Sequence, residues 1–189
     1  MWLAHCVHLN APEVGRMGAT GTGVAHCPTS NARLGAGIAP VRDLLDAGAP
    51  VGLGVDGGAS NESGELTDDL RGALLAARLR GGPSALTARE ALDLATRHGA
   101  RCLGREDELG HLTPGALADV ALWRLDDAGR AGIADPVAAL VLGPPRPVHG
   151  LFVHGDVVVE AGELRTADPA LLAADLARES ARLAERAAA

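Results

Sequence analysis

Residues 23–56, which read GVAHCPTSNARLGAGIAPVRDLLDAGAPVGLGVD, contain the pattern that decides the fold. A short apolar run at 23–27 is followed by a helical segment at 39–48, and a second apolar run occupies 51–56. Gly48 is suited to end the helix, because glycine readily adopts the left-handed conformation found at helix C-termini. A strand, a helix and a second strand in this order predict a parallel sheet with a right-handed crossover.

The same alternation extends to both sides of this stretch. Residues 2–9, WLAHCVHL, predict a buried strand before it, and residues 64–81 predict a long helix after it. The apolar face of that helix is expected to consist of Leu66, Leu70, Ala73, Leu74 and Ala77. Thr87 and Glu90 form a capping-box pattern that opens a further helix, expected to run to about residue 104. Because the strands are mostly apolar, both faces of the sheet should be covered.

The rest of the chain has a different character. The Pro114-Gly115 turn precedes a predicted strand, and residues 150–164 predict two short strands joined at His154-Gly155-Asp156. Asp168 and Pro169 are typical of the start of a helix. The domains expected from these patterns are an α/β body over 1–104, a small β-domain over 105–166 and a C-terminal helix over 167–189.

The composition excludes several classes of function. The 189 residues include 17 basic and 24 acidic side chains, for a net charge of −7. Every basic residue is Arg, which excludes a Schiff-base lysine and a P-loop lysine. No nucleic-acid partner is expected, because a basic face is needed to neutralise phosphates. No apolar run reaches the length of a membrane span, and three cysteines without a C-x-x-C pair fit a reducing compartment, so a cytoplasmic protein without a membrane partner is expected.

Ionisable side chains stand at the ends of three successive predicted strands. His5 ends the first, His26 the second and Asp56 the third. The carboxyl ends of parallel strands meet at one edge of a sheet, which is where chemistry collects in such folds. Imidazoles and a carboxylate are the ligands of catalytic zinc or iron sites. The plainer alternative is that Asp56 caps the following segment and that each histidine packs as a structural residue.

Two other motifs have competing interpretations. Residues 52–57, GLGVDG, satisfy G-x-G-x-x-G, but a dinucleotide-binding motif requires a helix directly after the glycines. The segment GASNESG follows instead, which argues against that interpretation. The second motif is the pair of His and Cys clusters near the N-terminus. It allows an alternative interpretation as a small zinc-binding module, whose four ligands would be His5, Cys6, His26 and Cys27.

Four motifs in chain order carry a family resemblance. They are H-C-x-H at 5–8, H-C-P-x-S-N-x-R-L at 26–34, G-x-D-G-x-x-S-N at 54–61 and P-G-x-x-A-D at 114–119. Together they resemble the amidohydrolase superfamily, in its branch of aminohydrolases that deaminate purines and triazines. The resemblance implies the C-terminal part of a (β/α)8 TIM-like barrel, with part of a small β-sandwich. The strands that end at His5, His26 and Asp56 would be the sixth, seventh and eighth of the barrel.

The resemblance also implies a reaction and a role for each residue. Asp56 would bind one divalent metal ion, zinc or alternatively iron, and would shuttle a proton from the attacking water. His5 would orient or polarise that water, and His26 would lie on the substrate side of the pocket. The expected reaction is hydrolytic deamination of a purine-type base such as 8-oxoguanine, or of a triazine.

The sequence departs from the family pattern in one respect. The strand-one H-x-H pair, the strand-five histidine and the glutamate that follows it have no counterpart among the 189 residues. We therefore expect a C-terminal portion that is inactive on its own, with open, aggregation-prone sheet edges. The expected partners are a separate N-terminal half or further copies in a homo-oligomer. The alternative function is that of an inactive remnant that binds or complements a partner.

Overall fold

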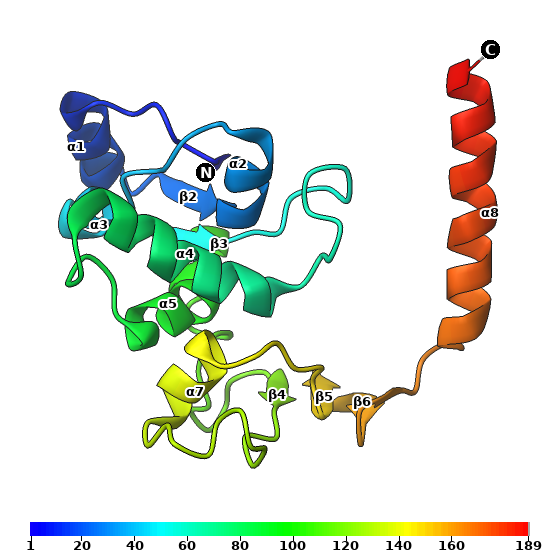
Figure 1. The fold of residues 1–189 in the computed structure, drawn as a ribbon. Coiled ribbons are helices and arrows are strands. Elements are labelled where there is room, and N and C mark those ends of the chain that lie inside the picture. The colour runs from blue at the N-terminus through cyan, green and yellow to red at the C-terminus, as the bar shows by residue number, and fades with distance from the viewer. Residues whose placement is uncertain (189) are drawn as a thin grey trace. The chain divides into compact units, whose positions relative to one another are not determined.

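A computed structural model describes residues 1–188, which contain both helices and strands (Figure 1). The α/β class predicted from the sequence is confirmed. The chain divides into two compact units. The first consists of Met1–Leu117 and Leu125–Pro145, and the second of Ala118–Arg124 and the residues from Arg146 onward.

A three-stranded parallel sheet forms the centre of the first unit (Figure 1). Its strands are β1 (Trp2–Ala4), β2 (Gly23–His26) and β3 (Val51–Leu53), in the order β1-β2-β3. In register, Leu3 pairs with Val24 and Val24 with Val51. The parallel arrangement predicted for these three strands is confirmed.

Seven helices accompany this sheet in the described part of the first unit. They are α1 (Ala11–Thr20), α2 (Pro28–Leu34), α3 (Val41–Asp46), α4 (Leu66–Gly81), α5 (Ala88–Ala95), α6 (Arg97–Leu103) and α7 (Pro136–Leu142). The predicted capping box is present at α5, where the Thr87 hydroxyl accepts from the Glu90 amide and Glu90 accepts from the Thr87 amide. The single helix expected up to residue 104 is wrong, because the backbone of Thr96 leaves the helical region and separates α5 from α6.

The core lies between the sheet and the helices. Val24 and Val51 are fully buried in one apolar cluster with residues of α1, α3, α4 and α5. Four of the five apolar positions expected on α4 are buried, namely Leu70, Ala73, Leu74 and Ala77. Leu66 is 39% exposed, because it is the first residue of the helix and extends beyond the buried face.

β1 corrects one expectation about this sheet. It was predicted as a buried strand, but Trp2 is 48% and Leu3 46% exposed. The physical reason is the packing of helices, since α3 to α6 pack against β3, at the other edge of the sheet, whereas β1 packs mainly against β2 and Leu3 lies outside the core cluster. An edge strand with unpaired backbone groups and apolar side chains is a template for association with another strand.

This edge predicts concentration-dependent self-association. Leu3→Lys should reduce it, because a charged side chain on an edge strand opposes pairing with a second sheet. Sedimentation velocity over a series of protein concentrations measures the effect. Leu172→Lys, at a position 53% exposed in the C-terminal helix, is the matched control and should behave like the unsubstituted chain. Equal association of the Leu3→Lys and unsubstituted chains would contradict the prediction.

The second unit contains an antiparallel sheet in the order β4-β5-β6-β7. Its strands are β4 (Val120–Leu122), β5 (Gly150–Val153), β6 (Asp156–Glu160) and β7 (Glu163–Leu164). The predicted hairpin is confirmed, with φ of 53° at His154 and 88° at Gly155, as two-residue hairpin loops require. A second turn of the same kind at Ala161-Gly162 joins β6 to β7, which was not expected from the sequence.

The last helix of the second unit is α8 (Pro169–Ala188). It begins as predicted, with the Asp168 carboxylate accepting from the Ala170 amide at 2.8 Å. Its leucines are exposed, and none of its described residues is buried. Among residues 1–188, every helix is too short or too polar to cross a membrane.

Candidate functional site

The ends of the three parallel strands bring the predicted site residues to one edge of the sheet. His5 directly follows β1, and its amide donates to the Ala25 carbonyl at 2.9 Å. His26 is the last residue of β2. Its carbonyl accepts from the Gly54 amide at 2.9 Å, which keeps the chain beside β2 until it reaches Asp56.

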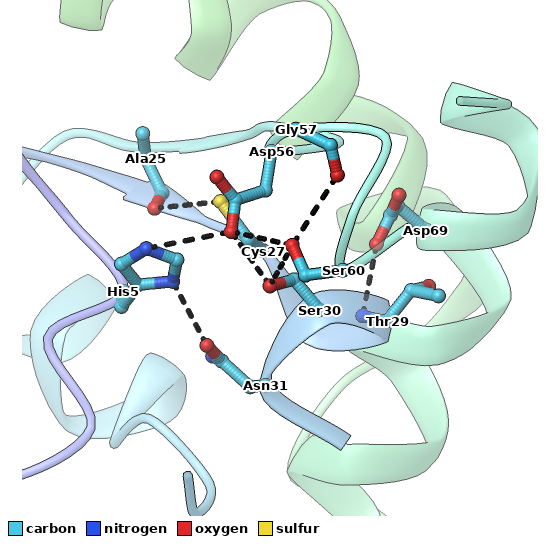
Figure 2. Close-up of polar contacts among 10 residues, drawn as sticks. All are labelled: His5, Ala25, Cys27, Thr29, Ser30, Asn31, Asp56, Gly57, Ser60 and Asp69. Carbon is cyan, nitrogen blue, oxygen red and sulfur yellow. Dashed lines mark hydrogen bonds and ion pairs between the residues drawn. The ribbon is translucent and has the colours of Figure 1, made fainter. Parts of the chain in front are cut away.

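The backbone turns sharply where His5 and Asp56 are placed. The φ angles are 63° at His5, 53° at Cys6 and 65° at Asp56, all in the left-handed region. Residues other than glycine are uncommon there, and such conformations cluster at functional sites. This backbone ends the strand and directs the two side chains toward each other (Figure 2).

His5 and Asp56 form the centre of the site. His5 Nε2 lies 3.7 Å from Asp56 Oδ2, and both side chains are about one-third exposed. On its other side, His5 Nδ1 donates to Asn31 Oδ1 at 2.9 Å (Figure 2). The Asn31 carboxamide therefore sets the orientation of the imidazole ring and places its second nitrogen near the carboxylate.

Two serine hydroxyls hold the Asp56 carboxylate. Ser30 Oγ donates to Oδ2 at 2.6 Å and Ser60 Oγ donates to the same oxygen at 3.1 Å (Figure 2). The Ser30 hydroxyl, followed by the Gly57 amide and the Ser60 hydroxyl, lowers the pKa of Asp56 below its usual range. Asp56 is therefore an anion at neutral pH, as a metal ligand or a proton acceptor must be.

His26 has a different environment. It is 1% exposed, and neither ring nitrogen has a hydrogen-bond partner among the described residues. Burial, followed by the nearby charge of His5, lowers the pKa of His26 to about 4, so the ring is neutral at physiological pH. It shares a strand face with Val24, which lies in the core.

A mostly apolar cleft of about 500 Å³ lies beside His26, between α2 and α4. Asn31 lines the same cleft, as do Leu75 and Leu79 of α4. The structure thus brings the His5 and Asp56 side chains into direct contact, and it places His26 at the wall of this cleft. Asn31 connects the two places, because it also bonds to His5.

The donors present fit part of a metal site. Within residues 1–188, no three His, Cys, Asp or Glu side chains are close enough together to hold a metal ion. The Asp56 carboxylate and the His5 imidazole are both ligand types that zinc accepts. Two such donors fit one side of a zinc site, and the remaining ligands would have to come from elsewhere.

The alternative prediction of an independent zinc-binding module is wrong. Its ligands would have been His5, Cys6, His26 and Cys27, but these side chains form no metal-binding group in the described chain. The two thiols donate weakly to the carbonyls of Leu3 and Ala25. Burial raises the pKa of both, that of Cys27 to about 11, which disfavours the thiolate that zinc requires.

Asp69 was not singled out from the sequence. Its side chain is fully buried on α4, where Oδ1 accepts from the Thr29 amide and Oδ2 from Asn61 Nδ2, each at 3.0 Å. One signal could have found it, since Asp69 lies three residues after Leu66 and one before Leu70, on the face predicted to be apolar. A carboxylate at such a position needs dedicated donors.

Comparison with known proteins identifies the family to which this chain is similar. Residues 1–158 match the amidohydrolase family. The chain is 46% identical over 181 residues to an 8-oxoguanine deaminase of Pseudomonas aeruginosa, a match that covers 96% of this chain and 38% of that protein.

Two solved structures resemble the fold. An adenosine deaminase of Xanthomonas campestris with bound zinc has a TM-score of 0.93 at 28% identity, over 97% of this chain and 42% of that chain. An atrazine chlorohydrolase of Arthrobacter aurescens TC1 complexed with zinc has a TM-score of 0.86 at 42% identity, over 92% of this chain and 39% of that chain. The chain thus spans about two fifths of the length of the proteins it matches.

Proposed function

This chain belongs to the amidohydrolase family, and from this premise we propose that it carries part of the active site of a metal-dependent aminohydrolase. The observation that supports this most is the pairing of His5 with an ionised Asp56 at the carboxyl edge of a parallel sheet. In this proposal residues 1–104 are the last three strands and the helices of a (β/α)8 barrel. Residues 105–166 are part of a small β-sandwich, and the segment 167–189 carries the C-terminal helix, with residue 189 outside the described residues.

The proposed chemistry assigns a task to each side chain. Asp56 would hold one divalent ion, zinc being favoured by the zinc-bound structures that the fold resembles. When bound, such an ion supplies a water whose pKa is lowered to about 7. Asp56 accepts the proton of the attacking water and passes it on toward the departing ammonia. His5, oriented by Asn31, positions that water against the ring carbon that carries the amino group.

The proposed substrates are purine-type bases or triazines. The names of the similar proteins, which refer to 8-oxoguanine, adenosine and atrazine, support a small nitrogen heterocycle. We further propose that His26 shapes the substrate side of the pocket. Asn31 supports this assignment, because it lines the cleft beside His26 and also bonds to His5.

A chimera tests the function in a complete enzyme. This chain replaces the matching 181-residue segment of the Pseudomonas aeruginosa 8-oxoguanine deaminase. With zinc, the chimera should release ammonia from 8-oxoguanine, with adenosine and atrazine as comparison substrates. The isolated 189-residue chain should neither retain stoichiometric zinc through dialysis nor release ammonia, because in this proposal it supplies one metal ligand, Asp56, where catalytic zinc needs three. A folded, zinc-loaded chimera without activity would contradict the proposal.

One observation favours a second candidate function, that of a complementing partner. The edge of β1 exposes Trp2 and Leu3 and offers a strand for pairing. The test mixes this chain with the remaining segment of the same deaminase, expressed separately. Ammonia release by the mixture alone would support complementation, whereas an inactive mixture beside an active covalent chimera would argue against it.

A further inference from the structure

Two carboxylates connect the same two segments of the chain. The segments are residues 29–30, in the first turn of α2, and residues 60–61, in the turn that follows β3. Asp56 binds one residue of each segment and Asp69 binds the other residue of each. The inner carboxylate, Asp69, is fully buried, and the outer one, Asp56, faces the site.

The inner connection is made by Asp69. Its Oδ1 accepts from the Thr29 amide and its Oδ2 from Asn61 Nδ2, each at 3.0 Å (Figure 2 shows the first). Asn61 Oδ1 accepts from Ser63 Oγ at 3.1 Å, which fixes the carboxamide with its amino group toward Asp69. A buried carboxylate is costly unless donors compensate for its lost hydration. Here burial raises the pKa of Asp69, while the bonds from Thr29 and Asn61 lower it.

The outer connection is made by the next residue on each segment. Ser30 and Ser60 both donate to Asp56 Oδ2, and their hydroxyl oxygens are 3.0 Å apart. Asn31, which follows Ser30 in α2, accepts from His5. A displacement of residues 29–30 would therefore move Ser30 and Asn31, and a displacement of residues 60–61 would move Ser60, so each reaches the His5–Asp56 pair through its hydrogen-bond partners.

We propose that Asp69 is a positioning residue for the His5–Asp56 pair, because it fixes the two segments that deliver Ser30, Ser60 and Asn31 to it. The meaning of this role for catalysis rests on the proposed function. Asp69 touches neither His5 nor Asp56, and it acts through the residues it holds.

Two variants of the full chain test this role. In Asp69→Asn, an amide nitrogen meets Asn61 Nδ2, and the two donors repel unless Asn61 rotates and gives up its bond from Ser63. In the double variant Asn61→Asp with Asp69→Asn, donor and acceptor are exchanged and both bonds can form again. Asp43→Asn is the matched control, because Asp43 is an exposed carboxylate on α3 in the same unit.

The main measurement is the ring signals of the seven histidines in carbon–proton correlation spectra. We expect Asp69→Asn to shift the His5 signal and leave His149 and His154, in the second unit, unchanged. The double variant should return the His5 signal to its original position, and Asp43→Asn should not move it. In the chimera, Asp69→Asn should lower kcat about 10-fold or more, as loss of an outer-shell partner does, with recovery in the double variant.

Several results would overturn the inference. An unchanged His5 signal in folded Asp69→Asn would do so, as would a double variant that regains stability without regaining the His5 signal. If Asp69→Asn does not fold, Asn61→Ser removes only one of the two bonds and should shift the His5 signal alone. An inactive unsubstituted chimera would reject the proposed function, whereas the histidine signals test the positioning role without metal or substrate.

Discussion

Asp56→Asn is expected to abolish ammonia release by the chimeric deaminase, with a loss of more than about 100-fold in kcat. Loss of an outer-shell partner already costs 10–100-fold, and Asp56 is proposed as a direct ligand and proton acceptor. Asparagine keeps the shape of the side chain and can still accept from Ser30 and Ser60. It cannot carry the charge or take up the proton, so the variant separates chemistry from folding.

The control for this experiment is Asp43→Asn, at an exposed position in the first turn of α3. Initial rates of ammonia release and the zinc content after dialysis are measured for both variants. Asp43→Asn should match the unsubstituted chimera in both quantities. An Asp56→Asn chimera that retains zinc and at least a tenth of the activity would remove Asp56 from the proposed site.

The second large effect is a loss of stability in mild acid that depends on His26. The folded-state pKa of His26 is lowered to about 4 from an ordinary value of 6.5. Between these values the unfolded chain binds a proton that the folded chain excludes. The contribution of His26 is therefore fully present above pH 6.5 and is lost as the pH falls toward 4. At 1.36 kcal/mol per pKa unit, this amounts to about 3 kcal/mol of unfolding free energy.

Urea unfolding of the chain and of His26→Gln at several pH values measures this effect. The difference between the two free energies of unfolding isolates His26, because other titrating groups cancel in the subtraction. Asp69 is one of these groups. Because its pKa is raised in the folded chain, its contribution to the unfolding free energy increases as the pH falls, opposite to that of His26. His8→Gln, at an exposed histidine, is the matched control for the substitution itself. A pH-independent difference for His26→Gln would show that His26 has the same pKa in the folded and unfolded chains, and it would contradict the prediction.

Much of the fold could be predicted because local signals specify it. The capping box of Thr87 and Glu90 and the hairpin at His154-Gly155 depend only on neighbouring residues, and both are present. The placement of His5 and Asp56 at one edge could be predicted for a different reason. In a parallel sheet all strands end at the same edge, so the edge that carries His5 and Asp56 could be predicted. Their direct approach across β2 depends on the left-handed backbone at both residues, which the strand pattern does not indicate.

The features that could not be predicted depend on distant contacts. The bond between Asp69 and Thr29 joins residues 40 positions apart, and periodicity carries no information about such pairs. The exposure of β1 has the same origin, because an apolar run does not indicate which edge strand the helices cover. The break at Thr96 has no local signal, because neither glycine nor proline stands at that position.

The left-handed backbone at His5, Cys6 and Asp56 creates a trade-off between the stability of the chain and its proposed function. Glycine at any of these positions would relax the backbone, because it has no Cβ to clash, at a gain of about 1 kcal/mol each. At His5 and Asp56 the same change would delete the reactive group. A protein engineer who optimised this sequence for thermal stability alone would be led to glycine at both places. A screen that followed backbone strain alone would remove the proposed catalytic pair, so stability screens must be coupled to an activity screen.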